Sequence, residues 1–308
     1  MLPRACLRRA PVPRSSLRRR RAAQRWLGNV LASTRRSMTT TTYIIVEPSN
    51  GALDMSPAPN AYEIGELIPV ARPELEGVAP VLYRLEHTER QLPRVRELAE
   101  SHHRDGRPPL ICCVLETEAV TDVIREHLAE SLLLRKPADG SVVFRYYDPR
   151  VYAHLGSILA PGQMLTLMGP VTRWTYLDVA RAWQEASFDG NGSGSLAVTD
   201  EQYEQIARLS FVRRALELLR DAGVAMSADL PRQLDTQLRK AERYGLSPED
   251  QIPFALHGVL VAPNFDRHPQ VQSALSQVRE TPYVDAVGQW SDNDWQRIGQ
   301  ESAQYPLS

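Results

Sequence analysis

The sequence lacks the long apolar runs and the cysteine content that would define some protein classes at once. No stretch approaches the roughly 18 to 20 apolar residues of a membrane span, so we expect a soluble body that needs no membrane partner. Only three of the 308 residues are cysteine. Cys112 and Cys113 are adjacent in a predicted buried strand, where neighbouring side chains point to opposite faces and cannot easily pair or share a metal. We interpret them as small buried residues in a reducing compartment.

Acidic residues are absent from residues 1–37, which contain eleven arginines. Subtracting these 11 from the 36 basic residues leaves 25 against 37 acidic residues in 38–308, a net charge of about -12 for the body. A nucleic-acid partner requires a basic face that neutralises phosphates, so the body is a poor candidate for binding nucleic acid.

The basic N-terminal segment, residues 1–42, admits three interpretations. It resembles an organelle transit peptide in being rich in arginine and free of acids. A second, less favoured interpretation is a basic arm that contacts nucleic acid or a membrane. We favour a third interpretation, translated upstream sequence, because Met38 precedes the threonines 39–42 and the first predicted strand. On this interpretation residues 1–42 form a disordered tail.

Recognisable catalytic and cofactor motifs are also missing. The glycine-rich stretch 190–194 has no following lysine, so it is no phosphate-binding loop, and no Gly-x-Ser-x-Gly sequence occurs. His102 and His103 fall in a predicted polar loop, without ligands at metal-binding spacing. Asp148 and His154 could form a catalytic pair, but a helix cap already explains Asp148. We therefore expect no catalytic, metal or cofactor site.

Apolar runs alternate with helical patterns over residues 43–188, which predicts a mixed α/β, or α+β, lobe. Residues 189–195 form a Gly/Ser linker by composition. Beyond it the period is helical, which predicts an all-helical lobe over 196–280 and a tail, 281–308, with a short helix after Ser291. The predicted strands are 43–46, 81–85, 110–115 and 142–147, and the predicted helices are 89–101, 118–130, 199–222, 231–243, 253–261 and 269–278.

The segment from Phe144 to Arg150 is dense in aromatic and charged residues. Alternation of Val142, Phe144 and Tyr146 with Val143, Arg145 and Tyr147 predicts a strand with one apolar face. Asp148 followed by Pro149 predicts a helix start, because the carboxylate can accept free backbone N–H groups and proline at the first helical position loses no bond.

Several segments together resemble the type VI secretion effector adaptors, also called effector chaperones (Tap or Tec proteins), which carry a DUF4123-type domain. The resemblance spans residues 43–276. It rests on Pro80, Leu82 and Leu85; on Ala138, Asp139 and Gly140 with Phe144, Arg145, Tyr147, Asp148, Pro149 and Arg150; on Gly169, Pro170 and Trp174; and on Tyr244 to Leu246 with Phe265 to Pro269. Ala262, Pro263 and Asn264 depart from the family pattern, where a glycine is common.

The resemblance implies a cytoplasmic bacterial adaptor that binds a cognate toxic effector and loads it onto the VgrG spike protein. The candidate protein-binding residues are Arg145, Tyr147, Arg150, Arg173 and Trp174, types that are enriched at interface anchors. Their alternative role is internal, and for Arg145 we favour an ion pair with Asp148. The competing class is a hydrolase-like enzyme of an unrecognised type, which would require an aromatic cleft with a strongly shifted acid or histidine.

Overall fold

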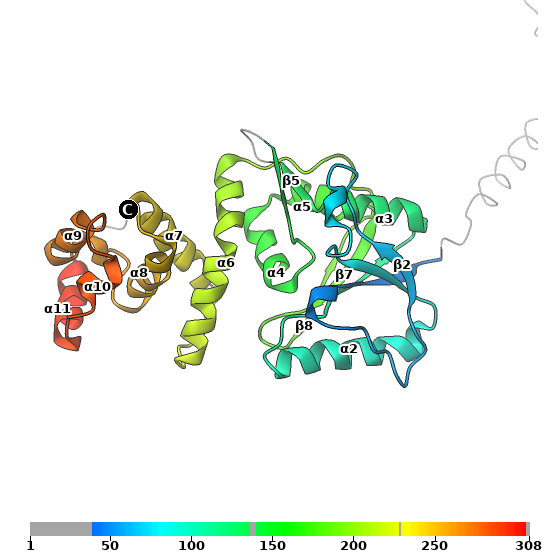
Figure 1. Cartoon of the computed structure of the whole chain (residues 1–308), viewed down its shortest axis with the longest axis horizontal. Helices are drawn as coiled ribbons and strands as arrows, with labels where there is room; N and C mark the ends of the chain where they lie inside the picture. The colour runs from blue at the N-terminus through cyan, green and yellow to red at the C-terminus, as the bar shows by residue number, and fades with distance from the viewer. Residues whose placement is uncertain (1–38, 136–139, 228, 306–308) are drawn as a thin grey trace, which may run out of the picture. The chain divides into compact units, whose positions relative to one another are not determined.

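The computed structural model describes residues 39–135, 140–227 and 229–305 (Figure 1). The predicted N-terminal tail, residues 1–42, lies outside these residues except for 39–42, and Ala138 and Asp139 also lie outside them. The described chain is a mixed α/β region followed by helices from residue 200 onward, as predicted. None of the described helices combines the length and the apolar character that crossing a bilayer requires.

A six-stranded antiparallel sheet forms the centre of the α/β region, with the strand order β2-β3-β1-β4-β7-β8. The first strand occupies a middle position, where Tyr43 pairs with Arg84 on one side and Leu115 on the other. The strands are β1 (Thr41–Val46), β2 (Tyr62–Glu66), β3 (Val81–Leu85), β4 (Ile111–Thr117), β7 (Val171–Leu177) and β8 (Trp183–Ser187). The sequence predicted β1, β3 and β4 but not β2, β7 and β8.

Helices cover both faces of this sheet (Figure 1). On one face Ile44 and Val114 pack against Val95 of α2 (Thr88–Arg104). On the other face Tyr43 and Leu115 pack against a cluster that includes residues of three helices. These are α3 (Thr121–Glu130), α4 (Pro149–Ile158) and α5 (Pro161–Met168). Alternate residues of β1 therefore belong to two separate cores, which explains the continuous burial of that strand.

The strand predicted over 142–147 is shorter than expected. A small hairpin pairs β5 (Leu133–Arg135) with β6 (Ser141–Val143), apart from the main sheet. The last backbone hydrogen bond between the two arms of this hairpin runs from Phe144 N to Leu132 O, at 2.7 Å. The predicted alternation is wrong, because Val142 and Val143 are both exposed whereas Tyr146 and Tyr147 are both buried. The chain leaves the ladder at Phe144, so the two-residue period of a strand no longer governs which side chains are buried.

The helical region begins at α6 (Asp200–Asp221), whose predicted capping box between Thr199 and Gln202 is present. The largest difference from the predicted helix boundaries is at α8 (Pro248–Leu260), which begins at Pro248 rather than Pro253. The Ser247 side chain accepts the N–H of Asp250 and starts this helix one turn earlier, so Pro253 lies inside it. The remaining elements are α7 (Leu230–Arg243), α8 (Pro248–Leu260), η3 (Phe265–Arg267), α9 (Pro269–Ser276), α10 (Tyr283–Val287) and α11 (Asp292–Ser302).

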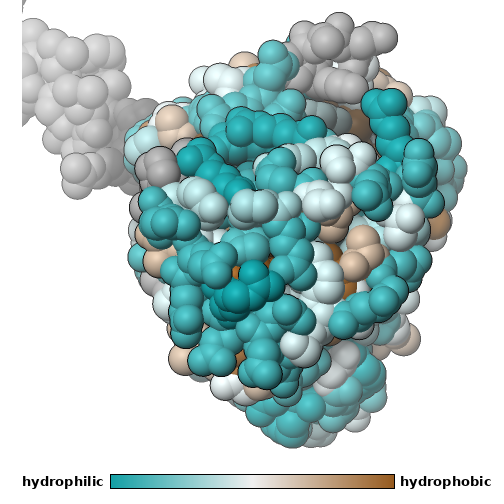
Figure 2. All heavy atoms as spheres, turned by 90° about the vertical axis from the view of Figure 1, so that its left-hand side faces the viewer, coloured by the Kyte–Doolittle hydropathy of each residue, from teal (hydrophilic) through white to brown (hydrophobic). Residues whose placement is uncertain are grey.

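The predicted C-terminal tail, residues 281–308, contains α10 and α11, and both helices contribute residues to the helical core. Ser291 and Asp294 make the expected capping box of α11. The ring of Trp295 packs on that of His257, with 4.1 Å between their centroids, and Trp290 lies 5.0 Å from Trp295. The surface at this end of the molecule is mainly hydrophilic (Figure 2).

The two regions are joined by more than the connecting segment. Helix α6 contacts both regions. Its first turns pack on the α/β core through Tyr203, Ile206 and Leu209, and its later residues pack with α7 and α8. Gly192 lies against α5, because a Cβ at this position would come within 1.8 Å of the Leu165 carbonyl oxygen. The predicted linker, residues 189–195, is thus packed against α5 at Gly192. The predicted domain boundaries stay a prediction.

Candidate functional site: a buried polar corner

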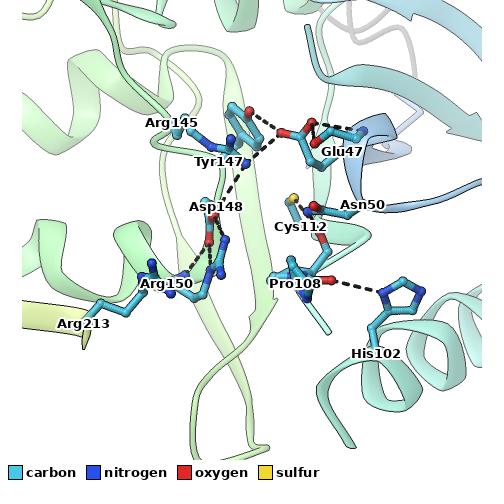
Figure 3. Close-up of polar contacts among 12 residues, drawn as sticks. Glu47, Asn50, His102, Pro108, Cys112, Arg145, Tyr147, Asp148, Arg150 and Arg213 are labelled. Atoms are coloured by element: carbon cyan, nitrogen blue, oxygen red, sulfur yellow. Dashed lines mark hydrogen bonds and ion pairs between the residues drawn. The ribbon is translucent and has the colours of Figure 1, made fainter. Parts of the chain in front are cut away.

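A buried carboxylate at the end of β1 organises the candidate site. The Glu47 side chain is only 2% exposed and caps the short helix η1 (Pro48–Asn50). It accepts hydrogen bonds from the Ser49 hydroxyl at 2.7 Å, from Arg145 Nη2 at 2.9 Å and from the Tyr147 hydroxyl at 2.8 Å (Figure 3). A buried carboxylate without such partners would cost several kcal/mol, so these donors are required by the fold.

Asp148 occupies the adjacent position and caps α4, as the sequence predicted. Its carboxylate accepts the backbone N–H of Arg150 at 2.9 Å. The Arg150 guanidinium also donates to it, through Nε at 2.9 Å and Nη2 at 2.6 Å. Arg145 lies 3.8 Å from Asp148, farther than its 2.9 Å from Glu47. The expected Arg145–Asp148 pair is therefore secondary, because Glu47 and Arg150 provide the closer partners.

The aromatic residues of the motif lie inside the α/β core. Trp174 is fully buried and stacks on Tyr152 with ring centroids 5.1 Å apart, while Tyr146 lies 6.0 Å from it. Tyr147 is also buried, and burial raises the pKa of its hydroxyl. Tyr147 and Trp174 thus serve the fold here, and neither presents a surface to a partner in this structure.

Gly169 and Pro170 connect α5 to β7 in a turn that demands glycine. Gly169 has a φ of +56°, and a Cβ there would come within 2.2 Å of the His127 ring. The Pro170 carbonyl oxygen accepts the Thr117 hydroxyl at 2.7 Å. This pair of the motif fixes the entry into β7, which carries Arg173 and Trp174.

Three of the predicted binding residues reach solvent. The side chains of Arg145, Arg150 and Arg173 are 44%, 26% and 47% exposed. Arg173 pairs with Glu116 and Glu185, each at 3.4 Å, on the sheet. Arg145 and Arg150 instead line a cavity of about 390 Å³ beside α6, together with Val142, Val143 and Tyr203. The structure thus brings Arg145 and Arg150 together and places Arg173 elsewhere.

The residues that were weighed for chemistry have other partners. Asp148 is bonded to Arg150 rather than His154, whose pKa is lowered by burial. His102 lies in α2, not in a loop, and its Nδ1 is within 3.1 Å of the Pro108 carbonyl oxygen. Burial raises the thiol pKa of Cys112 and Cys113. Within the described ranges, His, Cys, Asp and Glu form no group of three or more that could hold a metal ion.

Glu47 is the residue of this site that sequence reasoning missed. The local signal is an acid placed directly after the apolar run 43–46 and before a proline. An acid at the end of a buried strand needs donors, but nothing nearby in the sequence identifies Arg145 and Tyr147 as those donors.

Residues 66–164 match the family model described as Domain of unknown function (DUF4123). This domain is found in type VI secretion effector adaptor (Tap/Tec) proteins. The match includes residues 144–150 but neither Gly169–Trp174 nor the helical region, and β1, the partner of β3 and β4 in the sheet, precedes it. No curated protein and no solved structure matches the chain.

Proposed function

We propose that this protein is a type VI secretion adaptor that binds a cognate toxic effector and loads it onto the VgrG spike. The observation that carries the proposal is the DUF4123 match over residues 66–164. The adaptor acts in the cytoplasm, before firing, and binds its partners without catalysing a reaction.

The geometry of the corner supports a binding role for this domain. Glu47 and Asp148 hold Arg145 and Arg150 from the buried side, so both guanidinium groups are fixed at the edge of a cavity. Arginine side chains whose geometry is fixed lose little entropy on contact with a partner, which favours their use in recognition. The partly exposed Val142 and Val143 add apolar surface to the same cavity.

The test is co-purification of the chain with the effector and with the spike protein encoded near its gene, combined with a delivery assay. Deletion of the gene is expected to stop delivery of the cognate effector while the secretion machine continues to deliver other cargo. The purified complex is expected to contain the effector in intact form, and prolonged incubation should release no cleavage product.

Two results would contradict the proposal in different ways. Loss of all secretion on deletion would indicate a structural component of the machine instead of an adaptor. Unchanged delivery of every effector would remove the support for an adaptor role. The control restores the deleted gene as the Arg125→Gln variant. This substitution changes an exposed arginine on α3 that does not line the cavity, so delivery of the cognate effector should return to its normal level.

A further inference from the structure

A second cavity, of about 630 Å³, is lined by the end of α2, the start of α4, the turn between β7 and β8, and the second half of α6. Seven arginines and three acidic residues line it. They include Arg104 and Arg107, Arg150, Arg181 and three arginines between positions 213 and 220. The lining of this arginine cleft has four more positive than negative charges, whereas residues 38–308 have a net charge of about -12. Two of the positive charges are balanced from outside the lining, because Arg107 pairs with Asp105 and Arg150 with Asp148.

Two of the three acids of the cleft, Asp178 and Glu217, are engaged by other groups, whereas Asp221 is exposed and follows Arg220 in the sequence. The Asp178 carboxylate accepts the backbone N–H groups of Ala180 and Ala182 at 2.8 Å and 2.9 Å. Its second oxygen accepts the side-chain amide of Gln184 at 2.8 Å. Asp178 is thus used to build the β7–β8 turn, and little of its charge is left to balance the arginines.

A second acid of the cleft, Glu217 of α6, is also paired within its own helix. Its carboxylate lies 2.8 Å from Arg213 and 3.4 Å from Arg214. In contrast, no acid among the described residues lies within ion-pair distance of Arg104, Arg181 or Arg220, and all three residues are exposed. The cleft therefore retains positive charge that the described part of the chain does not neutralise.

Arg181 has an unusual backbone conformation in this turn. Its φ is +64°. Among the described residues, Arg181 is the single non-glycine residue with a positive φ. A glycine would adopt this conformation without strain, so the backbone itself does not call for arginine at this position. Strained residues of this kind are often found at functional sites, and here the strained residue places a guanidinium in the cleft.

We propose that the arginine cleft binds an acidic segment of a partner protein, with carboxylates on Arg104, Arg181 and Arg220. The guanidinium group suits this partner, because its planar array of donors matches the two oxygens of a carboxylate. The buried apolar residues Ile111 and Leu177, which also line the cleft, suit the apolar side chains of such a segment. This inference rests on the proposed adaptor function only for the identity of the partner protein that provides the acidic segment.

The charge distribution favours an acidic polypeptide over nucleic acid. A nucleic acid strand carries regularly spaced phosphates that extend beyond a single cleft, and the body around the cleft has an excess of acids that repels them. A short acidic segment places its charges within the cleft alone. Its association should be accelerated by the local positive field and weakened by salt.

The experiment measures fluorescence anisotropy of a short labelled peptide of alternating glutamate and leucine, at low ionic strength and at about 0.15 M salt. The full chain is expected to bind this peptide and to bind its glutamine analogue far more weakly. The double variant Arg181→Gly/Arg220→Gln should reduce affinity by about tenfold, since two charge-assisted contacts are lost. Its melting temperature should not fall, because glycine relieves the positive φ at position 181.

The matched control, Arg90→Gln/Arg125→Gln, removes two exposed arginines outside the cleft and should bind the peptide like the parent. Equal binding by the cleft variant, or no binding by the parent, would overturn the proposal. Tighter binding of a labelled oligothymidine than of the peptide would also overturn it and assign the cleft to nucleic acid. A parent chain that binds the peptide but no effector would contradict the proposed function and leave the cleft assignment standing.

Discussion

The carboxylate of Glu47 accepts a hydrogen bond of 2.8 Å from the Tyr147 hydroxyl, one hundred residues further along the chain. The same oxygen, Oε2, accepts the Arg145 guanidinium at 2.9 Å. The end of β1 is thereby joined to the segment that leads into α4. Because Glu47 and Tyr147 are buried, this contact fixes the position of Arg145 at the cavity edge more firmly than a surface ion pair could.

Replacing Glu47 with Gln is expected to lower the free energy of unfolding by about 1–3 kcal/mol. The amide keeps the shape of the side chain but loses the charge that Arg145 and Tyr147 both contact. Urea denaturation of the purified protein measures the change. Glu118→Gln, on an exposed residue, is the control and should stay within about 0.5 kcal/mol of the parent. Equal stability of the two variants would show that Glu47 does not organise the corner.

The features that the sequence predicted well are local ones. The Asp148 cap, the Thr199–Gln202 box and the end of α6 near Gly223 each depend on residues within one or two helical turns. Their hydrogen bonds form between close neighbours in the chain, so residue type and spacing specify them directly. The same holds for α11, where Ser291 and Asp294 are three residues apart.

The features that the sequence did not predict depend on distant partners. Strands β2 and β8 lie at the sheet edges, where polar residues such as Glu63 and Glu185 are tolerated and the apolar alternation is weak. Burial of Tyr146 is set by its packing on Trp174 and by its hydroxyl, which donates to the Leu128 carbonyl at 3.1 Å. Neither relationship leaves a pattern in the segment 142–147 itself.

Variants of Asp148 can separate its two roles. Asp148→Ala removes the cap of α4 and the partner of Arg150, with an expected loss of about 2–3 kcal/mol. Asp148→Asn retains a capping oxygen and removes only the charge, so its loss should be smaller by about 1 kcal/mol. We expect both variants to bind the effector less well, because Arg150 is no longer fixed. A chemical activity lost in Asp148→Ala at unchanged stability would contradict the structural role.

Gly169 and Gly77 form a matched pair for testing the turn before β7. Both have positive φ, +56° and +82°, but a Cβ at Gly169 would meet the His127 ring at 2.2 Å, whereas at Gly77 it would meet nothing within 4 Å. Gly77→Ala should cost about 1–2 kcal/mol from backbone strain alone. Gly169→Ala should cost more for two reasons. Its φ of 56° with a ψ of -119° lies outside the left-handed region that alanine can adopt, and the His127 ring must move from its 2.9 Å contact with the Leu167 carbonyl oxygen. Thermal denaturation compares the two variants, and equal losses would contradict both reasons.

Stability should depend on pH through His257, which is packed between Tyr283 and Trp295. Burial lowers the pKa of His257 to about 4, from an ordinary value near 6.5 in the unfolded chain. Between these two values the unfolded chain binds a proton that the folded chain does not. The contribution of neutral His257 to the free energy of unfolding is therefore fully present above about pH 6.5. It is lost as the pH falls toward 4, which lowers the free energy of unfolding by roughly 3 kcal/mol.

His257→Phe tests this dependence, because phenylalanine keeps an aromatic ring against Trp295 and cannot titrate. At neutral pH the variant should be less stable than the parent, since the Tyr283 hydroxyl loses the partner it has at 2.7 Å from His257 Nδ1. Between pH 6.5 and 4, however, its unfolding free energy should fall less steeply than that of the parent. The pKa values of His127 and His154 are also lowered by burial, so the unfolding free energy of both the parent and His257→Phe should still fall somewhat with falling pH. Urea denaturation across this range, with exposed His87→Phe as the control, measures the difference, and parallel slopes in all three proteins would refute the assignment to His257.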